Sequence, residues 1–458
     1  MASVSYWFLS PSMMLALLGK LRGWDRTTPT PNFSWRSTVV DAVVPARNEE
    51  ASIDLCLASI LEQDFPIRKI TVVDDGSTDR TAQVVRRFAE LSGREIALIA
   101  HSASTGKTTS IREQCQSSDA DALLVVDADT VLRQRNYVTR LVQELYRNPG
   151  VASACGEVTP LTWRRRRRLA HLNPVVLAVK RDLRIAVQTP SRWQAFLEFW
   201  TVLYRVSLYV FLQRILYDGH LKLFGSRLNP IGCAVLYRTD RLRECFAFAA
   251  PQMGDNLSNS EDIFIGHFFN WKGYRNVQVA GVQCESIEPE VTRLPRQLYN
   301  WSSSFLQSLY YFRDLPLSPF RQVKTGVTSL FERRPPDVDN GPIIREQYRA
   351  PWGEVFTRRW GRGIGLLDLV SIIERVSYPC LLIYFSIFNP RIFLFSIGLE
   401  TALSTASVFL VAGSGRRLKS AGMMLVSTPI RLFSLGVDLV AVLHHLLDLA
   451  TGNRKWRK

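Results

Sequence analysis

The stretch Leu123-Leu124-Val125-Val126-Asp127-Ala128-Asp129-Thr130 decides the fold of this chain. Its apolar half is typical of a strand that is buried on both faces of a parallel sheet. The two aspartates follow that strand one residue apart, and residues i and i+2 of an extended chain point the same way. Asp127 and Asp129 are therefore candidate ligands for one hard divalent cation, Mg²⁺ or Mn²⁺, of the kind that holds a nucleotide's phosphates. A solvated strand end or a helix N-cap is the alternative for the same residues.

Three more strands precede this one in the sequence. They are predicted over residues 38–44, 70–73 and 96–100, and helical patterns follow them over 51–63, over 81–91 and from the Gly106-Lys107 turn to residue 116. Strands that alternate with helices of this length predict a mostly parallel α/β sheet, whose ligands bind beyond the carboxyl ends of the strands. Each of the four strand ends carries charged residues, in chain order Glu49, Asp74 with Asp75, Lys107, and Asp127 with Asp129. The sequence therefore predicts one site at this edge of the sheet.

These motifs, taken in order, resemble those of the family-2 glycosyltransferases of the membrane-embedded polysaccharide synthase type, such as cellulose, chitin and hyaluronan synthases. The resemblance covers residues 39–312 and implies a GT-A-like catalytic domain. In that family a Pro-Ala-X-Asn-Glu-Glu loop and an Asp-Asp-Gly-Ser turn hold the uridine of a UDP-sugar, and a Gly-Lys turn and an Asp-X-Asp follow. The matching positions implied for donor binding are Pro45, Arg47, Glu49, Asp74, Asp75, Lys107 and Asp127, with the metal on Asp129 and Asp127. Arg47 replaces the family's tyrosine, and its planar guanidinium suits stacking on uracil.

Three later segments are similar to the acceptor side of the same family. Gly232-Cys233 precedes a Leu-Tyr-Arg strand, Ser260-Glu261-Asp262 resembles a Thr-Glu-Asp whose last residue is the general base, and residues 297–301 resemble Gln-X-X-Arg-Trp. The resemblance thus implies acceptor-binding roles for Gly232, Cys233, Gln297 and Trp301, and catalytic roles for Asp262 and Glu261. A helix N-cap with an acidic first turn is the alternative for residues 260–262, and both interpretations can hold together.

The last of these motifs departs from the family at one position. The family's arginine is Asn300 here, so a cation expected near the departing diphosphate is missing. Arg296 or Arg293 is expected to replace it, because arginine suits bidentate phosphate contacts. Altered donor choice or reduced processivity is the alternative consequence.

The resemblance implies an inverting, metal-dependent transfer of a hexosyl or N-acetylhexosaminyl group. Loss of UDP builds positive charge on the sugar and negative charge on the diphosphate. The metal and Lys107 stabilise the leaving group, while Asp262 accepts the proton of the acceptor hydroxyl. The expected acceptor is the end of a growing polysaccharide or another glycan, with export as a further expectation. A non-processive transfer to a lipid-linked acceptor is the alternative.

Length and composition place the catalytic domain beside a membrane region. The chain has 458 residues, 47% of them apolar, which is enough for one large domain and a second region. Stretches 366–388, 392–412 and 423–449 are long enough to span a bilayer, and a shorter one, 6–18, is a fourth membrane candidate or a signal peptide. Lys20, Arg22 and Arg26 favour a cytoplasmic catalytic domain. The predicted organisation is an N-terminal hydrophobic segment 1–26, a catalytic domain 37–312, an interfacial region 313–365 with a family loop over the nucleotide, membrane helices 366–450 and a basic tail 451–458 of a multi-pass cell-membrane protein.

Other classes of protein explain fewer of these features. The net charge of +16 and the arginine run 164–168 suggest nucleic acid, but no nucleic-acid module is recognisable and an anionic lipid surface accounts for the charge. Residues 101–108 differ from a P-loop only at the first glycine, which is His101. A P-loop nucleotidase leaves the later motifs unexplained, and an inactive membrane scaffold is supported only by Asn300. The seven cysteines contain no Cys-X-X-Cys pair, which argues against zinc and a disulfide framework.

Overall fold

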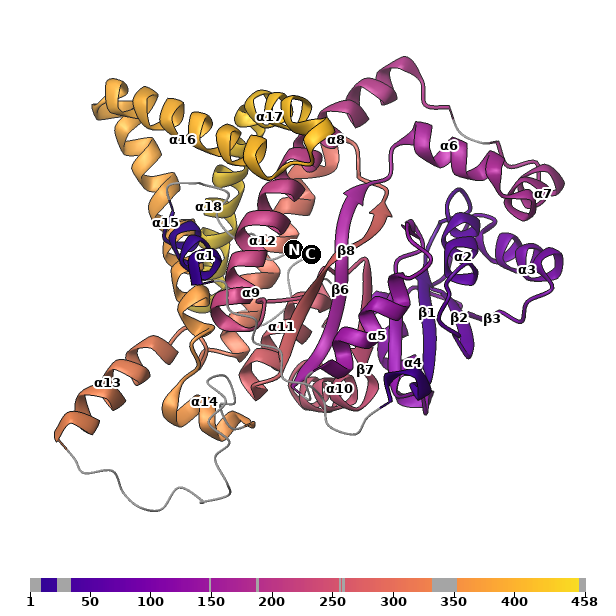
Figure 1. The fold of residues 1–458 in the computed structure, drawn as a ribbon, viewed down its shortest axis with the longest axis horizontal. Helices are drawn as coiled ribbons and strands as arrows, with labels where there is room; N and C mark the ends of the chain where they lie inside the picture. Colours follow the sequence, from indigo (N-terminus) through magenta and orange to yellow (C-terminus); the bar gives the residue numbers. More distant parts are fainter. Residues whose placement is uncertain are drawn as a thin grey trace.

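A mixed β-sheet with helices packed on it forms one side of the molecule, and a set of long helices forms the other (Figure 1). The computed structural model describes residues 10–22, 34–147, 150–186, 189–254, 257, 260–331 and 352–452. The predicted GT-A-like arrangement of a sheet with helices packed against it is confirmed.

The sheet has eight strands within the described residues, in the order β3-β2-β1-β4-β7-β6-β8-β5. Their bounds are β1 Val40–Ala46, β2 Lys69–Asp74, β3 Ala97–Ala100, β4 Ala122–Val126, β5 Thr130–Leu132, β6 Val151–Pro160, β7 Ala234–Arg238 and β8 Arg275–Ser286. The first four strands pair in parallel, as the sequence predicts, whereas β7 runs antiparallel to both β4 and β6. Beyond β4 the sheet is mixed, because β8 pairs in parallel with β6 and antiparallel with β5. The later strands carry more polar residues than β4 does, so their sequence signal is weaker.

Helices surround the parallel half of the sheet, and the first three of them lie close to their predicted places. They are α2 Ile53–Leu61, α3 Thr81–Ser92, α4 Lys107–Ser117 and α5 Tyr137–Arg147. In α5 the buried residues Tyr137, Leu141 and Leu145 recur every fourth position, which gives the helix one apolar face. All residues of β1 and β4 are buried beneath these helices, so the polar strand ends are presented at a rigid edge.

The remaining helices lie along both halves of the sheet. They are η1 Trp35–Ser37, α6 Trp163–Leu172, α7 Pro174–Asp182, α8 Arg192–Phe211, η2 Leu212–Tyr217, α9 Asp218–Phe224, α10 Thr239–Met253, α11 Glu261–Lys272, η3 Val291–Arg293 and α12 Leu294–Tyr311. Helix α7 packs against α2 and α3, whereas α8 packs against β6 and α11 against β8. The first helix, α1 Pro11–Arg22, packs against α9, where a Cβ on Gly19 would lie 1.9 Å from the Gly219 carbonyl oxygen. The predicted segment 6–18 begins outside the described residues, and the helix begins at Pro11.

The C-terminal helices form the side of the molecule away from the parallel strands (Figure 1). They are α13 Ser318–Phe331, α14 Glu354–Trp360, α15 Gly365–Phe388, α16 Pro390–Val411, η4 Ser414–Arg416, α17 Arg417–Val426 and α18 Thr428–Thr451. Helices α15 and α18 pack together, while α16 crosses near their ends (Figure 1). The predicted stretch 423–449 is broken at Ser427, between α17 and α18.

Among the residues that the structure describes, three helices are long and apolar enough to cross a membrane. They are Arg192–Phe224, Pro390–Val411 and Thr428–Thr451. The last two overlap predicted spans, but Arg192–Phe224 was not predicted and α15 is not one of the three. Helix α15 buries Asp368 against His267 and Glu374 against Ser12, so its first half faces protein.

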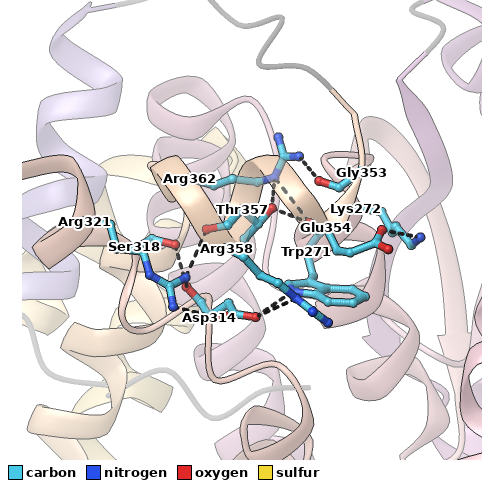
Figure 2. Close-up of polar contacts among 10 residues, drawn as sticks. All are labelled: Trp271, Lys272, Asp314, Ser318, Arg321, Gly353, Glu354, Thr357, Arg358 and Arg362. Atoms are coloured by element: carbon cyan, nitrogen blue, oxygen red, sulfur yellow. Dashed lines mark hydrogen bonds and ion pairs between the residues drawn. The ribbon is translucent and has the colours of Figure 1, made fainter. Parts of the chain in front are cut away.

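Helix α14 is held against the C-terminal end of α11 by several polar contacts (Figure 2). The Thr357 hydroxyl donates to the Trp271 carbonyl at 2.5 Å, and Arg362 Nε donates to the Thr357 hydroxyl at 2.6 Å. Lys272 Nζ lies 2.7 Å from Glu354 Oε2. This part of the predicted interfacial region is therefore fixed to α11. The loop over the nucleotide is predicted within 313–365, of which residues 332–351 lie outside the described residues.

Candidate active site

A cavity of about 300 Å³ lies where the end of β4 meets the start of α11 and the side of α12. The predicted residues that line it are Lys107, Asp127, Asp129, Gly232, Cys233, Glu261, Asp262, Gln297 and Trp301. They come from five separate places in the sequence, so the fold brings the predicted metal, catalytic and acceptor residues together. Their roles remain predictions.

The loop after β4 fixes the two aspartates of the cavity. The Asp127 backbone N–H donates to the Cys233 carbonyl at 2.9 Å, and its carbonyl accepts from the Thr130 N–H at 2.9 Å. The Asp129 carboxylate accepts from the Thr130 hydroxyl at 3.1 Å and from the Ser286 hydroxyl at 3.4 Å. This tight turn places both carboxylates at the cavity wall.

Burial and mutual repulsion shape the electrostatics of this pair. Burial raises the pKa of Asp127 to about 7, with Lys107 lowering it and Asp129 raising it. Burial likewise raises the pKa of Asp129 to about 7, and Glu49 adds to the effect. A divalent cation would favour the ionised form of both groups. The described residues contain no cluster of three or more His, Cys, Asp or Glu side chains arranged for a metal. Two carboxylates by themselves suit Mg²⁺ or Mn²⁺, which commonly take one or two carboxylates and complete their shell with phosphate oxygens and water.

Lys107 supplies the positive charge of the cavity. Its Nζ lies 2.7 Å from Asp127 Oδ1 and 2.8 Å from Glu261 Oε1. Burial lowers the pKa of Lys107, but the two carboxylates outweigh that effect and hold it well above its usual value. The side chain is therefore a cation located between the predicted metal ligand and the start of α11.

The acidic start of α11 is held close to the Gly232 backbone. Asp262 Oδ2 accepts from the Gly232 N–H at 3.2 Å and from Asn229 Nδ2 at 3.4 Å. A Cβ on Gly232 would lie 2.9 Å from Asp262 Cγ, so only glycine permits this approach. Ser260 precedes the helix at φ 50°, a left-handed conformation that is costly for serine, and its side chain makes no capping hydrogen bond. The N-cap interpretation therefore does not explain the segment by itself.

The predicted nucleotide loops lie next to the cavity but do not line it. The end of β1 carries Pro45, Arg47 and Glu49, and β1 pairs directly with β4. Arg47 is exposed, whereas Glu49 is partly buried and accepts from the Ser52 hydroxyl at 2.5 Å. Burial raises the pKa of Glu49, and Asp127 is one of the charges that add to this shift. The assignment of these residues to the nucleotide stays a prediction.

Asp74 and Asp75 organise the turns at the end of β2. The Asp74 carboxylate accepts from the Ser77 N–H at 3.0 Å. Asp75 accepts from the Thr105 N–H at 2.7 Å and from the Gly106 N–H at 2.9 Å. Burial raises the pKa of Asp75, but these bonds and that from Ser104 outweigh it and lower the pKa to about 2. Because a carboxylate already occupies these backbone donors, the turn cannot cradle phosphates as a P-loop does.

A buried arginine beside the acceptor motif was missed by the sequence analysis. The Arg205 side chain, on α8, is 0% exposed, and its Nε lies 3.2 Å from Glu288 Oε2. Its guanidinium donates to Gln297 Oε1 and lies 4.5 Å from the Trp301 ring centroid. By contrast, Arg293 and Arg296 are exposed and do not line the cavity. A lone arginine within an apolar helix was the available signal, because such a charge usually has a buried partner.

Several other residues that line the cavity belong to no recognised sequence motif. Tyr209, from α8, donates its hydroxyl to Glu288 Oε1 at 2.5 Å, and both residues line the cavity together with Ser286 and Ile231. Their positions depend on the packing of α8 against β6 and η3, which no local sequence pattern predicts.

Residues 41–205 match the family described as Glycosyl transferase family 2. This part of the chain is therefore a family 2 glycosyltransferase domain, which confirms the resemblance. The match includes Asp127 and Asp129 but ends before Gly232, Asp262 and Gln297.

Several curated proteins resemble about a quarter of the chain. An N-acetylglucosaminyltransferase of Rhizobium leguminosarum bv. viciae is 35% identical over 134 residues, which are 29% of this chain and 29% of that protein. An N-acetylglucosaminyltransferase of Bradyrhizobium elkanii is 34% identical over 121 residues, 26% of this chain and 65% of that protein. A poly-beta-1,6-N-acetyl-D-glucosamine synthase of Staphylococcus epidermidis is 23% identical over 109 residues, 24% of this chain and 26% of that protein. The chain thus matches less than two thirds of the length of each of these relatives.

Solved structures resemble the chain more loosely. A mannosyltransferase from Pyrobaculum calidifontis in complex with GDP-Man and Mn²⁺ has a TM-score of 0.43 and 17% identity, covering 94% of this chain and 95% of that one. TarS residues 1–349 of S. aureus in complex with UDP-GlcNAc has a TM-score of 0.40 and 12% identity, covering 90% and 92%.

Proposed function

Starting from this family 2 domain, we propose that the chain is an inverting glycosyltransferase that moves a hexosyl or N-acetylhexosaminyl group from a UDP-sugar to a glycan acceptor. The observation that carries the proposal is the meeting of Asp127, Lys107 and Asp262 in one cavity. A leaving-group cation and a proton acceptor are the two functions that glycosyl transfer requires. The names of the relatives make N-acetylglucosamine the first sugar to test.

The chemistry follows from the positions of these residues. Asp127 and Asp129 would hold Mg²⁺ or Mn²⁺, which supplies Lewis-acid stabilisation of the diphosphate. Lys107 adds a second positive charge on the same side of the cavity. Asp262 accepts the proton of the acceptor hydroxyl as that oxygen attacks the anomeric carbon, and Glu261 holds Lys107 in place. One in-line displacement inverts the anomeric configuration.

The acceptor and the location of the enzyme are parts of the same proposal. Gly232, Cys233, Gln297 and Trp301 form the acceptor side of the cavity. A growing polysaccharide is the first acceptor to test, and a lipid-linked glycan is the second, because Asn300 departs from the synthase motif. Exposed apolar side chains on α16 and α18, such as Leu394, Phe395 and Leu446, support a multi-pass protein of the cell membrane. The proposed cytoplasmic side of the catalytic domain rests on the basic residues that follow the first apolar segment.

Purified membranes incubated with a panel of UDP-sugars and Mg²⁺ or Mn²⁺ test this function. We expect transfer from one UDP-sugar, competitive inhibition by UDP and no inhibition by ATP, since the strand-end loops are proposed to recognise uridine. Chromatography and mass spectrometry of the product would identify the sugar and its linkage. ATP hydrolysis that Lys107→Ala abolishes, without any sugar transfer, would contradict the proposal.

We expect Arg205 to act as a positioning residue for the acceptor motif, because its fully buried side chain contacts Gln297 and Trp301 but does not line the cavity. Arg205→Gln should lower kcat/KM on the order of 10²-fold, because it leaves Glu288 buried without its cation and releases Gln297 and Trp301. Asn300→Arg should restore part of the loss, since positions 297, 300 and 301 share one helix face. The measurement is acceptor KM and kcat for both variants, with thermal unfolding to monitor the fold.

Arg296→Gln is the control for this experiment. The Arg296 side chain is exposed on α12, the helix that carries Gln297 and Trp301, and it does not line the cavity. A larger loss from Arg296→Gln than from Arg205→Gln would show that Arg296 is the cation of the motif.

A further inference from the structure

A second and larger cavity adjoins the proposed active site. It has a volume of about 600 Å³ and shares Val158 and Tyr209 with the catalytic cavity. Its walls come from β6, β8, η2 and the connection between α16 and α17. We call it the basic chamber because the charged residues lining it are Arg133, Arg165, Arg214 and Arg416 against Glu157 and Glu285.

The arginines of the basic chamber exceed its carboxylates by two. Arg165 Nε lies 3.2 Å from Glu285 Oε2, and Arg133 Nε lies 3.9 Å from Glu285 Oε1. Arg214 Nη2 lies 3.9 Å from Glu157 Oε2. Arg133 also donates to Gln283 Oε1 at 2.8 Å and Arg214 to the Val411 carbonyl at 3.2 Å. Each guanidinium has five N–H groups, so these contacts leave donors for another anion. Arginine presents a planar fork of donors that fits phosphate oxygens.

An apolar surface leads to the basic chamber. The chamber is lined by Ala412 and Arg416, and the nearby side chains of Leu410 on α16 and Leu418 on α17 are 72% and 82% exposed. Helix α16 is one of the helices long and apolar enough to cross a membrane. A ligand with a phosphate at one end and a hydrocarbon at the other would satisfy both surfaces.

We propose that the basic chamber binds the phosphate or diphosphate of a lipid-linked acceptor, while the hydroxyl of that acceptor reaches Asp262 past Tyr209. This assignment rests on the proposed function and adds the class of acceptor. It gives the four arginines a ligand that the donor site does not require. A water-soluble phosphorylated acceptor has the same headgroup chemistry, so the test must separate the two sources.

The test measures binding to the purified full chain in detergent, saturated with UDP and Mg²⁺ so that the donor site is occupied. The probes are farnesyl phosphate, inorganic phosphate and farnesol. We expect farnesyl phosphate to bind most tightly and farnesol most weakly. Arg214→Gln/Arg416→Gln should raise the Kd for farnesyl phosphate at least about 10-fold, the effect of one lost charged hydrogen bond.

The matched control is Arg167→Gln/Arg168→Gln, which removes the same charge from exposed positions of α6 outside the chamber lining. Its Kd should stay within about 2-fold of the wild type, because surface charges contribute little to a separate site. Arg416→Gln alone changes an exposed residue, so it provides a second test if the double variant unfolds.

Each outcome decides a separate question. Equal losses in the chamber and control variants, or no loss in either, would overturn the chamber assignment. Equal affinities for inorganic phosphate and farnesyl phosphate, both lost in the chamber variant, would keep the phosphate site but overturn the lipid source. UDP binding is measured in every variant, so failure of the donor site, and with it the proposed function, is seen independently.

Discussion

Asp262→Asn is expected to reduce turnover on the order of 10²-fold or more while leaving the affinity for UDP nearly unchanged. The amide keeps the shape of the carboxylate and can still lie against Gly232, but it cannot accept the proton of the acceptor hydroxyl. Steady-state kinetics with a fixed acceptor and varied UDP-sugar, together with direct UDP binding, separate these two effects.

Asp240→Asn is the matched control, because Asp240 also lies in the first turn of a helix, α10, and is exposed outside the cavity. It removes the same favourable interaction with a helix N-terminus, about 0.3–1 kcal/mol, without touching the proposed chemistry. If both variants lost the same small fraction of turnover, Asp262 would act only as a charge at the helix N-terminus and not as the base.

Asp129→Asn is expected to abolish sugar transfer, and EDTA is expected to abolish transfer by the wild-type chain. The substitution removes one of two carboxylates at the proposed cation site, and loss of stabilisation of the leaving group typically costs 10²–10³-fold or about 2.7–4 kcal/mol. Activity is measured over a titration of Mn²⁺. If the variant keeps any activity, it should need a much higher Mn²⁺ concentration than the wild type to reach half of its maximum.

Asp121→Asn is the control for the metal prediction. Asp121 precedes the other end of β4, where it is exposed and accepts from the Val39 N–H at 2.8 Å. Its loss should leave the Mn²⁺ requirement unchanged. Full activity of the wild type in EDTA would show that the transfer does not depend on a metal.

The sequence allowed prediction of the parallel half of the fold because each strand there is an uninterrupted apolar run that ends at a polar loop. Strand β4 is all buried, and its predicted and observed ends agree at Val126. Strand β8 is harder to predict, because its alternation of polar and apolar residues is interrupted at Ala280 and Gly281, where the glycine adopts φ 84°. Its place beside β6 depends on contacts between distant segments.

The residues of the cavity likewise divide into some that the sequence predicted and some that it did not. Asp127 and Asp129 are adjacent to a strong strand signal, and the resemblance supplied Asp262 and Gln297. Arg205 was not predictable in this way, because it meets Gln297 across 92 residues of sequence and belongs to no motif. The packing of α8 against η3 and the sheet brings the two together.

The attachment of α14 to α11 affects how inherited variation in this chain should be interpreted. Helix α11 has 12 residues, so its two ends lie about 18 Å apart. One end carries Asp262, and the other is tied through the Trp271 carbonyl to Thr357. A geneticist who found a loss-of-function allele at Thr357 would see a residue remote from the chemistry and classify it as a folding defect. Because Thr357 is hydrogen-bonded to the helix that carries Asp262, we expect such an allele to disturb the reacting groups as well as the fold.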